Sequence, residues 1–156
     1  MTPLLSTRPL HPVMVHFGED PSLPDVFDVV RVGLALGLNA IAHLVDTRQA
    51  VGPYLGCREH ATLLIPVKSG TADSWGAPYS DYSDCSRHTT VSTIRCGQSY
   101  GRSCRSCVWV EQFSLGARMT TTDPVALKGA LSLQRSRLAR GAGQLAVSPV
   151  RDVCHA

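Results

Sequence analysis

The longest apolar run in the chain covers residues 26–45, with the sequence VFDVVRVGLALGLNAIAHLV. Its periodicity is ambiguous. Residues 30–38 alternate as they would in a strand, whereas the length of the run and its alanine content favour a helix. Ser22, Pro24 and Asp25 precede the run and are typical of a helix start. We therefore expect one buried apolar helix over residues 26–45.

A second helix is predicted in the C-terminal third. Thr122 or Asp123 can cap its first turn, Pro124 suits the first helical position, and Gly141 suits the end. The positions that recur at helical spacing are Leu127, Leu131, Gln134 and Leu138. Three of these four are apolar, so we expect one face of this helix to pack on the domain.

Between these helices, three short segments have the residue types of β-strands. Residues 61–67 (ATLLIPV) read as a strand that Pro66 would place at a sheet edge. Residues 89–96 and 107–113 are rich in β-branched and aromatic residues, and residues 97–106 would join them as a long hairpin loop. We expect these segments to form a small antiparallel sheet.

Residues 69–86 (SGTADSWGAPYSDYSDCS) are expected to form a loop, because Ser, Gly, Asp and Pro dominate them. The loop carries Trp75, Tyr79 and Tyr82. These rings could stack on a ligand, but aromatic side chains in such loops more often fix the loop onto the domain. We therefore expect an anchoring role for them.

Together these elements predict the α+β class: a small antiparallel sheet with one buried apolar helix and a C-terminal basic helix. A chain of 156 residues fits one domain. Prolines interrupt residues 1–24, which we expect to be an irregular N-terminal segment. The domain is expected over residues 25–141, followed by a flexible tail at residues 142–156.

The composition raises a different possibility. The chain has 13 arginines but two lysines, Lys68 and Lys128, and it is rich in residues with GC-rich codons. Such a bias is typical of a GC-rich gene. It is equally typical of an orphan product from an overlapping or antisense reading frame, with no dedicated activity, and this alternative remains open.

Positive charge gathers in the C-terminal third, where eight basic and three acidic residues give residues 101–156 a net charge of +5. This imbalance suggests a nucleic acid or an acidic protein as partner, whereas solvated surface arginine is the plainer explanation. The candidate binding residues are Arg102, Arg105, Arg135, Arg137 and Arg140. The last three also fall where the helix dipole favours cations.

Metal-ligand spacing is the strongest chemical signal. Three pairs of residues share an i, i+3 spacing: Cys57 with His60, Cys85 with His88, and Cys104 with Cys107. The last two pairs form a Cys-x2-His-x15-Cys-x2-Cys pattern, a spacing used by zinc sites. Cys85, His88, Cys104 and Cys107 are therefore the predicted zinc ligands. They would clamp both ends of the predicted hairpin.

Two alternatives to this quartet remain. The first two pairs together offer a Cys2His2 set with a longer spacer, and the cysteines could simply be unliganded thiols. Because the first residues show no secretory signal, we expect an intracellular chain, cytoplasmic or nuclear, whose cysteines are reduced rather than paired in disulfides.

No nucleotide-binding, zinc-protease or serine-hydrolase motif is present, and no pair of carboxylates can be defended as an acid–base pair. We therefore expect a non-catalytic binding or regulatory module, stabilised by zinc, rather than an enzyme. A membrane-associated accessory protein using residues 26–45 is a further alternative, although Asp28, Arg31, Asn39 and His43 would be costly within a span.

Overall fold

The computed structural model describes residues 13–16, 21–75, 83–88, 104, 106–112 and 120–145. Its helices and strands, in chain order, are β1 (Val13–His16), β2 (Phe27–Gly33), α1 (Leu34–Asp46), β3 (Tyr54–Cys57), β4 (Thr62–Lys68), α2 (Thr71–Trp75), β5 (Ser83–His88), β6 (Cys107–Gln112) and α3 (Pro124–Leu145).

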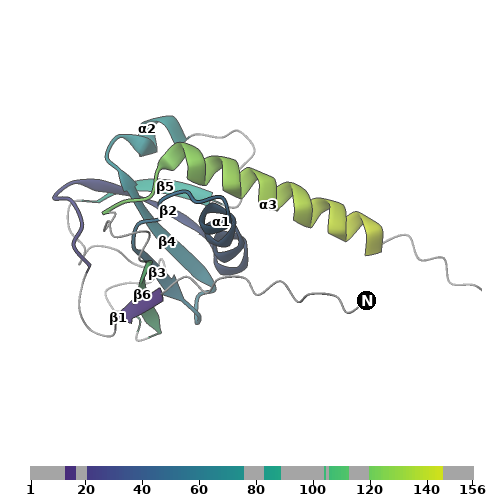
Figure 1. Ribbon diagram of the computed structural model, residues 1–156, viewed down its shortest axis with the longest axis horizontal. Helices are drawn as coiled ribbons and strands as arrows, with labels where there is room; N and C mark the ends of the chain where they lie inside the picture. The colour runs from purple at the N-terminus through teal and green to yellow at the C-terminus, as the bar shows by residue number, and fades with distance from the viewer. Residues whose placement is uncertain are drawn as a thin grey trace, which may run out of the picture.

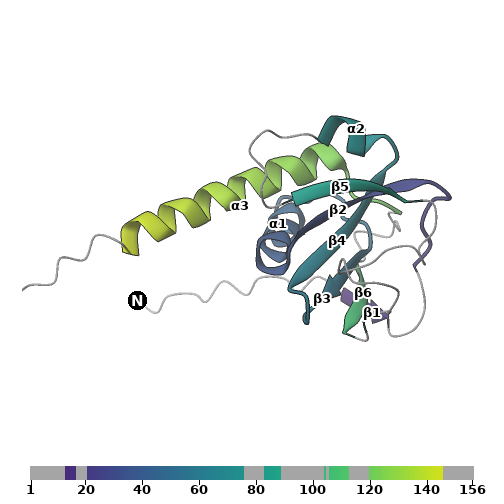
Figure 2. The same cartoon turned by 180° about the vertical axis from the view of Figure 1, so that it is seen from behind.

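The strands form one six-stranded sheet in the order β1-β6-β3-β4-β2-β5, and every pair of neighbouring strands is antiparallel. Helices α1 and α3 contact each other on one side of this sheet, as Figures 1 and 2 show from front and back. The predicted α+β class, with an antiparallel sheet, a buried apolar helix and a C-terminal helix, is confirmed.

The buried apolar helix is shorter than predicted, because the run at 26–45 divides into two elements. Its first part is strand β2 and only its second part is helix α1. Val29, Val30 and Val32 are β-branched and favour a strand, whereas leucine and alanine dominate from Leu34 onward and favour a helix. The first amide of the helix, that of Leu34, donates to the Ala61 carbonyl at 2.7 Å, so a neighbouring turn stabilises the helix start.

Strand β4 lies between β3 and β2, so the prediction that Pro66 marks an edge strand was wrong. The missing N–H of proline is still accommodated locally. Within a strand the N–H and C=O of one residue point to the same side. The Pro66 carbonyl accepts from the Thr122 amide at 3.0 Å, on the side where β3 does not extend. The proline therefore breaks no pairing between neighbouring strands.

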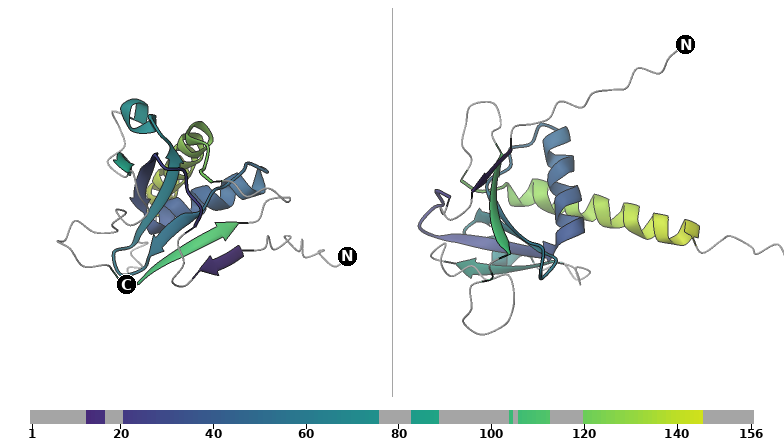
Figure 3. Two further views of the ribbon diagram at one scale, coloured as in Figure 1. Left: turned by 90° about the vertical axis from the view of Figure 1, so that its left-hand side faces the viewer. Right: turned by 90° about the horizontal axis from the view of Figure 1, so that it is seen from below.

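Both faces of the sheet carry buried apolar clusters. The face covered by α1 and α3 holds the larger cluster, which includes Val30, Ile65 and Leu127. The opposite face holds a smaller cluster of buried residues: Phe27, Val29, Leu55, Cys57, Leu64 and Trp109. We call these the helix face and the open face. The side views in Figure 3 show α1 and α3 on the same side of the strands.

Helix α3 begins as predicted and ends later. The Asp123 carboxylate accepts from the Ala126 amide at 2.8 Å, which is an N-terminal cap. The predicted end at Gly141 was wrong, because the helix continues to Leu145. Leu127, Leu131 and Gln134 are buried, but Leu138 is 55% exposed because the helix extends past the sheet (Figure 1).

Several further predictions can be placed. Strand β1 lies within residues 1–24, which were expected to be irregular, and α2 and the start of β5 lie within the expected loop at 69–86. The strand at 107–113 is confirmed as β6, and its neighbours in the described sheet are β1 and β3. The expected strand at 89–96 and the tail at 146–156 lie outside the described residues.

None of the helices in the described segments is both long enough and apolar enough to cross a membrane.

Two helical glycines give a matched test of this packing. A Cβ at Gly37 would lie 2.7 Å from Leu63 Cδ2 and 2.8 Å from Val32 Cγ1, both of them buried, whereas a Cβ at Gly129 meets nothing within 4 Å. We expect Gly37→Ala to destabilise the fold by about 1–3 kcal/mol through overpacking. Gly129→Ala should stabilise it by about 0.5–1 kcal/mol through helix propensity. Urea unfolding followed by circular dichroism measures both, and equal effects would contradict this packing of α1 on β4.

Candidate metal centre

The first half of the candidate centre is the turn between β3 and β4. Cys57 ends β3 and Thr62 begins β4, and these two residues are paired across the hairpin. Ala61 has a positive φ of 46°, which closes the turn, and the Thr62 hydroxyl donates to the His60 carbonyl at 2.8 Å. The turn therefore folds His60 back toward Cys57, whose Sγ accepts from the His60 amide at 3.5 Å.

The second half comes from strand β6, which lies beside β3. Cys107 begins β6 and is directly opposite Cys57 in the antiparallel register. Strand residues alternate between faces, and both cysteines belong to or pack against the cluster of the open face. Cys104, three residues before Cys107, packs against the same cluster. Three thiols thus converge at the corner where β3 ends and β6 begins.

The distances are those of a compact sulfur cluster. The Sγ atoms of Cys57, Cys104 and Cys107 all lie within 4.8 Å of one another, and those of Cys57 and Cys104 are 3.5 Å apart. This separation is far longer than a disulfide bond, which is about 2.05 Å, and all three residues are thiols. Cys57 is fully buried and the other two are partly buried.

His60 and Glu59 lie at the exposed side of the thiols. The Nδ1 atom of His60 is 3.3 Å from Cys57 Sγ. Glu59, His60 and Cys104 form a second group whose ligand atoms lie within 4.8 Å of one another. Cys104 belongs to both groups, so the described residues offer three thiols, one imidazole and one carboxylate around one corner of the sheet. This set is compatible with a bound metal ion.

Hydrogen bonds hold the Glu59 carboxylate in its charged form. Cys104 Sγ and Ser106 Oγ each donate to Glu59 Oε2 at 3.2 Å. The Cys104 bond, then the Ser106 bond and the charge of His60, hold the pKa of Glu59 below its ordinary value of 4.5. Glu59 is fully exposed. It therefore links Cys104 and Ser106 to the β3–β4 turn from the solvent side.

The predicted quartet of Cys85, His88, Cys104 and Cys107 is divided by this fold. Cys85 lies on β5 opposite Val30 and packs against the cluster of the helix face, whereas Cys107 packs on the open face. Three strands separate β5 from β6, a distance of roughly 19 Å at the usual strand spacing. His88 ends β5 in the same edge strand, and its side chain lies outside the described part of the structure.

The structure instead joins the first and third of the pairs found in the sequence. The metal set that the sequence suggests for Cys57 and His60 pairs them with Cys85 and His88, not with Cys104 and Cys107. The shared i, i+3 spacing was the available signal, but spacing alone cannot show which two pairs meet. The pairing of β3 with β6 decides it, and that contact joins segments 50 residues apart between Cys57 and Cys107.

The remaining candidate residues lie elsewhere. Arg135, Arg137 and Arg140 are on α3, with Arg137 and Arg140 exposed, while Arg102 and Arg105 lie outside the described residues. Trp75 ends α2 and is only 6% exposed, in keeping with an anchoring role. Tyr79 and Tyr82 lie outside the described residues.

The Glu59 contacts predict a pH-dependent effect. Ser106→Ala removes one hydrogen bond to the carboxylate, so the pKa of Glu59 should rise toward its ordinary value. The stabilisation linked to a lowered carboxyl pKa is present above the ordinary pKa and is lost as the pH falls through the lowered pKa. The difference in stability between wild type and Ser106→Ala should therefore vanish in acid. Carbon-detected NMR titration of the metal-free protein measures the pKa. Ser74→Ala, which removes a hydroxyl on α2, should leave it unchanged, and an equal shift in both variants would contradict the assignment.

Comparison of the chain with protein-family models, with curated proteins and with solved structures finds no match. The function is therefore argued from the geometry of the chain itself.

Proposed function

We propose that the chain is a non-catalytic binding module whose fold is completed by one structural zinc ion. The ligands are the thiolates of Cys57, Cys104 and Cys107 and the imidazole of His60. Glu59 is the competing choice for the fourth ligand. Zinc is favoured because three sulfur donors and one nitrogen donor are the set that this ion prefers in tetrahedral structural sites.

The observation that carries the proposal is the convergence of three thiols within 4.8 Å of one another, with His60 in contact with one of them. With Zn–S near 2.3 Å and Zn–N near 2.0–2.1 Å, the tetrahedron has edges of about 3.8 Å between two sulfurs and about 3.6 Å between sulfur and nitrogen. The Cys57–Cys104 distance is 3.5 Å and the Cys57–His60 distance is 3.3 Å. These two contacts are within about 0.3 Å of the corresponding edges, and the Cys107 sulfur lies within 4.8 Å of the other two sulfurs.

The surroundings also support thiolate ligands. The His60 amide lies 3.5 Å from Cys57 Sγ, and a donor in this position stabilises negative charge on the sulfur. Cys57 is fully buried, so its thiolate would be costly without a cation. Four protein ligands leave no open position for a substrate or a water molecule, and this is why we propose a structural rather than a catalytic role.

The ion would tie together parts of the chain that are distant in sequence. His60 and Cys104 are separated by 43 residues, so a cross-link between their segments removes considerable freedom from the unfolded chain. The site also borders the smaller of the two apolar clusters, at the boundary of β3 and β6. A metal clamp there would compensate for the modest burial on this face.

Metal removal tests the proposal directly. Purified protein should contain about one zinc per chain by elemental analysis. At free zinc a hundredfold above Kd, binding stabilises the fold by about 2.7 kcal/mol. A chelator should therefore lower Tm by roughly 5–10 °C for a chain of this size. Replacement by Co²⁺ should give the visible spectrum of a tetrahedral, sulfur-rich site.

Cys104→Ser and Cys57→Ser should abolish stoichiometric metal binding, and Cys104→Ser, at a partly exposed position, is the less disruptive of the two. Cys85→Ser is the matched control: the same substitution on the helix face should keep full binding. Comparison of zinc content between His60→Ala and Glu59→Ala identifies the fourth ligand, because the loss of the true ligand lowers zinc binding more. Less than about 0.2 zinc per chain, or equal metal loss in Cys85→Ser and Cys104→Ser, would overturn the proposal.

The binding surface that we propose is the part of α3 that extends past the sheet. Arg137 and Arg140 are exposed there at helical i, i+3 spacing, so their charges lie on one side of the helix. Leu138, between them in sequence, is exposed as well. A basic surface of this kind suits a polyanion, and nucleic acid is the partner that we propose.

Salt dependence tests this partner. Each arginine–phosphate contact contributes about 0.9 to the slope of log K against log salt concentration on duplex DNA. The double substitution Arg137→Gln, Arg140→Gln should therefore lower that slope by about 1.8. Fluorescence anisotropy with a labelled generic duplex measures it, with Arg48→Gln as a control for loss of a surface arginine elsewhere. Affinity that does not change between low and moderate salt would contradict the proposal.

A further inference from the structure

A pocket of about 610 Å³ lies between α2 and the first turns of α3, on the side of the molecule away from the cysteine cluster. Small-molecule sites usually have volumes of about 300–1,000 Å³, so the size suits a small organic ligand. The residues that line it are Lys68, Ser69, Gly70, Thr71, Ser74, Trp75, Pro124, Val125, Lys128, Gly129 and Ser132.

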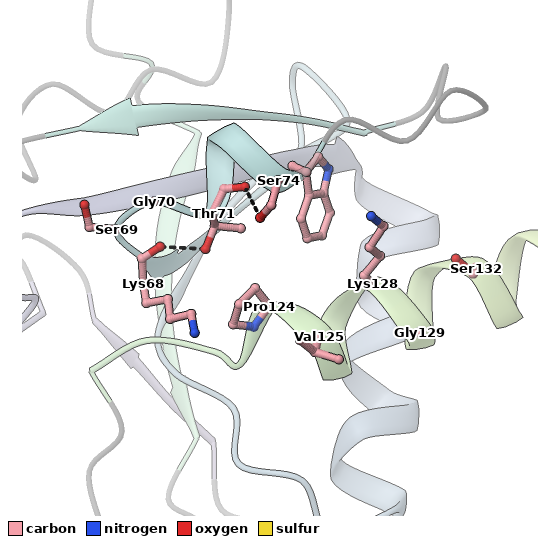
Figure 4. A pocket seen from close by; sticks show the side chains of 11 residues that line it. Lys68, Ser69, Gly70, Thr71, Ser74, Pro124, Val125, Lys128, Gly129 and Ser132 are labelled. Carbon is pink, nitrogen blue, oxygen red and sulfur yellow. Dashed lines mark hydrogen bonds between the residues drawn. The ribbon is translucent and has the colours of Figure 1, made fainter.

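The charge of the pocket is entirely positive. Lys68 and Lys128 are the only two lysines in the whole chain, and both line this one pocket. Figure 4 shows them at opposite ends of the pocket, with Pro124 between them in this view. No carboxylate is among the lining residues that the structure describes. Two ammonium groups therefore line the same pocket, whereas the hydroxyls of Thr71 and Ser74 donate to the backbone carbonyls of Lys68 and Thr71 (Figure 4).

Of the three acidic residues near the pocket, Asp73 is exposed on α2 and is not among the lining residues, and the other two accept from backbone amides. Asp28 is fully buried on β2, and its Oδ2 accepts from the Ala72 amide at 2.7 Å, which fixes α2 on the sheet. Asp123 caps α3 through the Ala126 amide. The helix start is thus occupied by the protein itself, so the lysines supply the attraction for an anion.

The walls between the lysines are apolar. Trp75, Pro124 and Val125 line the pocket, and Lys128 Nζ lies 5.8 Å from the centroid of the Trp75 ring. Contact with the ring holds the ammonium group over an apolar wall rather than in open solvent. Gly129 and Gly70 leave the space open, because a Cβ at either position would meet nothing within 4 Å.

We propose that this pocket binds a small organic phosphate: a phosphate monoester with a compact apolar or aromatic group. The dianionic phosphate suits a pocket whose two charged side chains are both lysines, because their ammonium groups attract phosphate as point charges from either end of the pocket. The apolar group fits against Pro124 and Val125. This site is separate from the metal centre, so it does not depend on the proposed zinc ion.

Phenyl phosphate is the probe for the test, used with the full chain as purified. The chain has two tryptophans, so in a Trp109→Phe background the fluorescence of Trp75 reports on the pocket alone. We expect saturable binding, weakened about tenfold or more by Lys68→Met or by Lys128→Met, since each removes one charge-assisted contact. Inorganic phosphate and phenol should each bind more weakly than phenyl phosphate.

Two further variants keep the test decisive. Gly129→Leu should keep the Tm of the wild type, because its Cβ meets no neighbour and leucine favours a helix. It should lose ligand binding, because the leucine side chain fills the pocket. Arg137→Met removes a positive charge from the same helix outside the pocket and should keep binding. No saturable binding, equal loss in Arg137→Met and Lys128→Met, or full binding in Gly129→Leu would overturn the proposal. Binding of benzoate or inorganic phosphate as tightly as phenyl phosphate would overturn the ligand class.

Discussion

The alternation of side chains along the central strands is the constraint on which the rest of this structure depends. Strands β2 and β4 send successive residues to opposite faces, and most of these residues are apolar on both sides. Both faces of such a sheet must be shielded from water. Helices α1 and α3 cover one face, and the cysteine corner lies on the other. A one-residue shift in register would exchange the two faces and separate Cys57 from its partners.

This division gives the two candidate sites different physical origins. The candidate metal centre arises where two neighbouring strands place cysteines opposite each other, so strand pairing positions the candidate ligands. The pocket that we propose for a phosphate arises between α2 and α3, where Gly70 and Gly129 leave space that side chains would otherwise fill. One site would stabilise the fold and the other would bind a ligand. Because they lie on opposite faces, either can be altered without direct contact with the other.

Sequence patterns predicted several features that depend on residues that are neighbours in the chain. The cap at Asp123, the strand at residues 107–113 and the i, i+3 ligand pairs were all readable, because each depends on a few residues near one another. The division of the run at 26–45 was also encoded, in the change from valine to leucine and alanine near Gly33. The length and overall apolarity of the run favour a single helix, whereas its residue types favour the two elements that form.

The sequence by itself determined the α+β class, the start of the last helix and three short pairs of metal-capable residues. Only the tertiary structure decided which pairs meet. Cys85 and Cys107 carry the same side chain and similar local signals, but they lie on opposite faces and three strands apart. The same holds for Lys68 and Lys128, which line one pocket only because the end of β4 and α2 lie near the first turns of α3. Contacts between distant segments depend on the order of the strands and on the face of the sheet that each side chain occupies. No local pattern in one sequence specifies these two features.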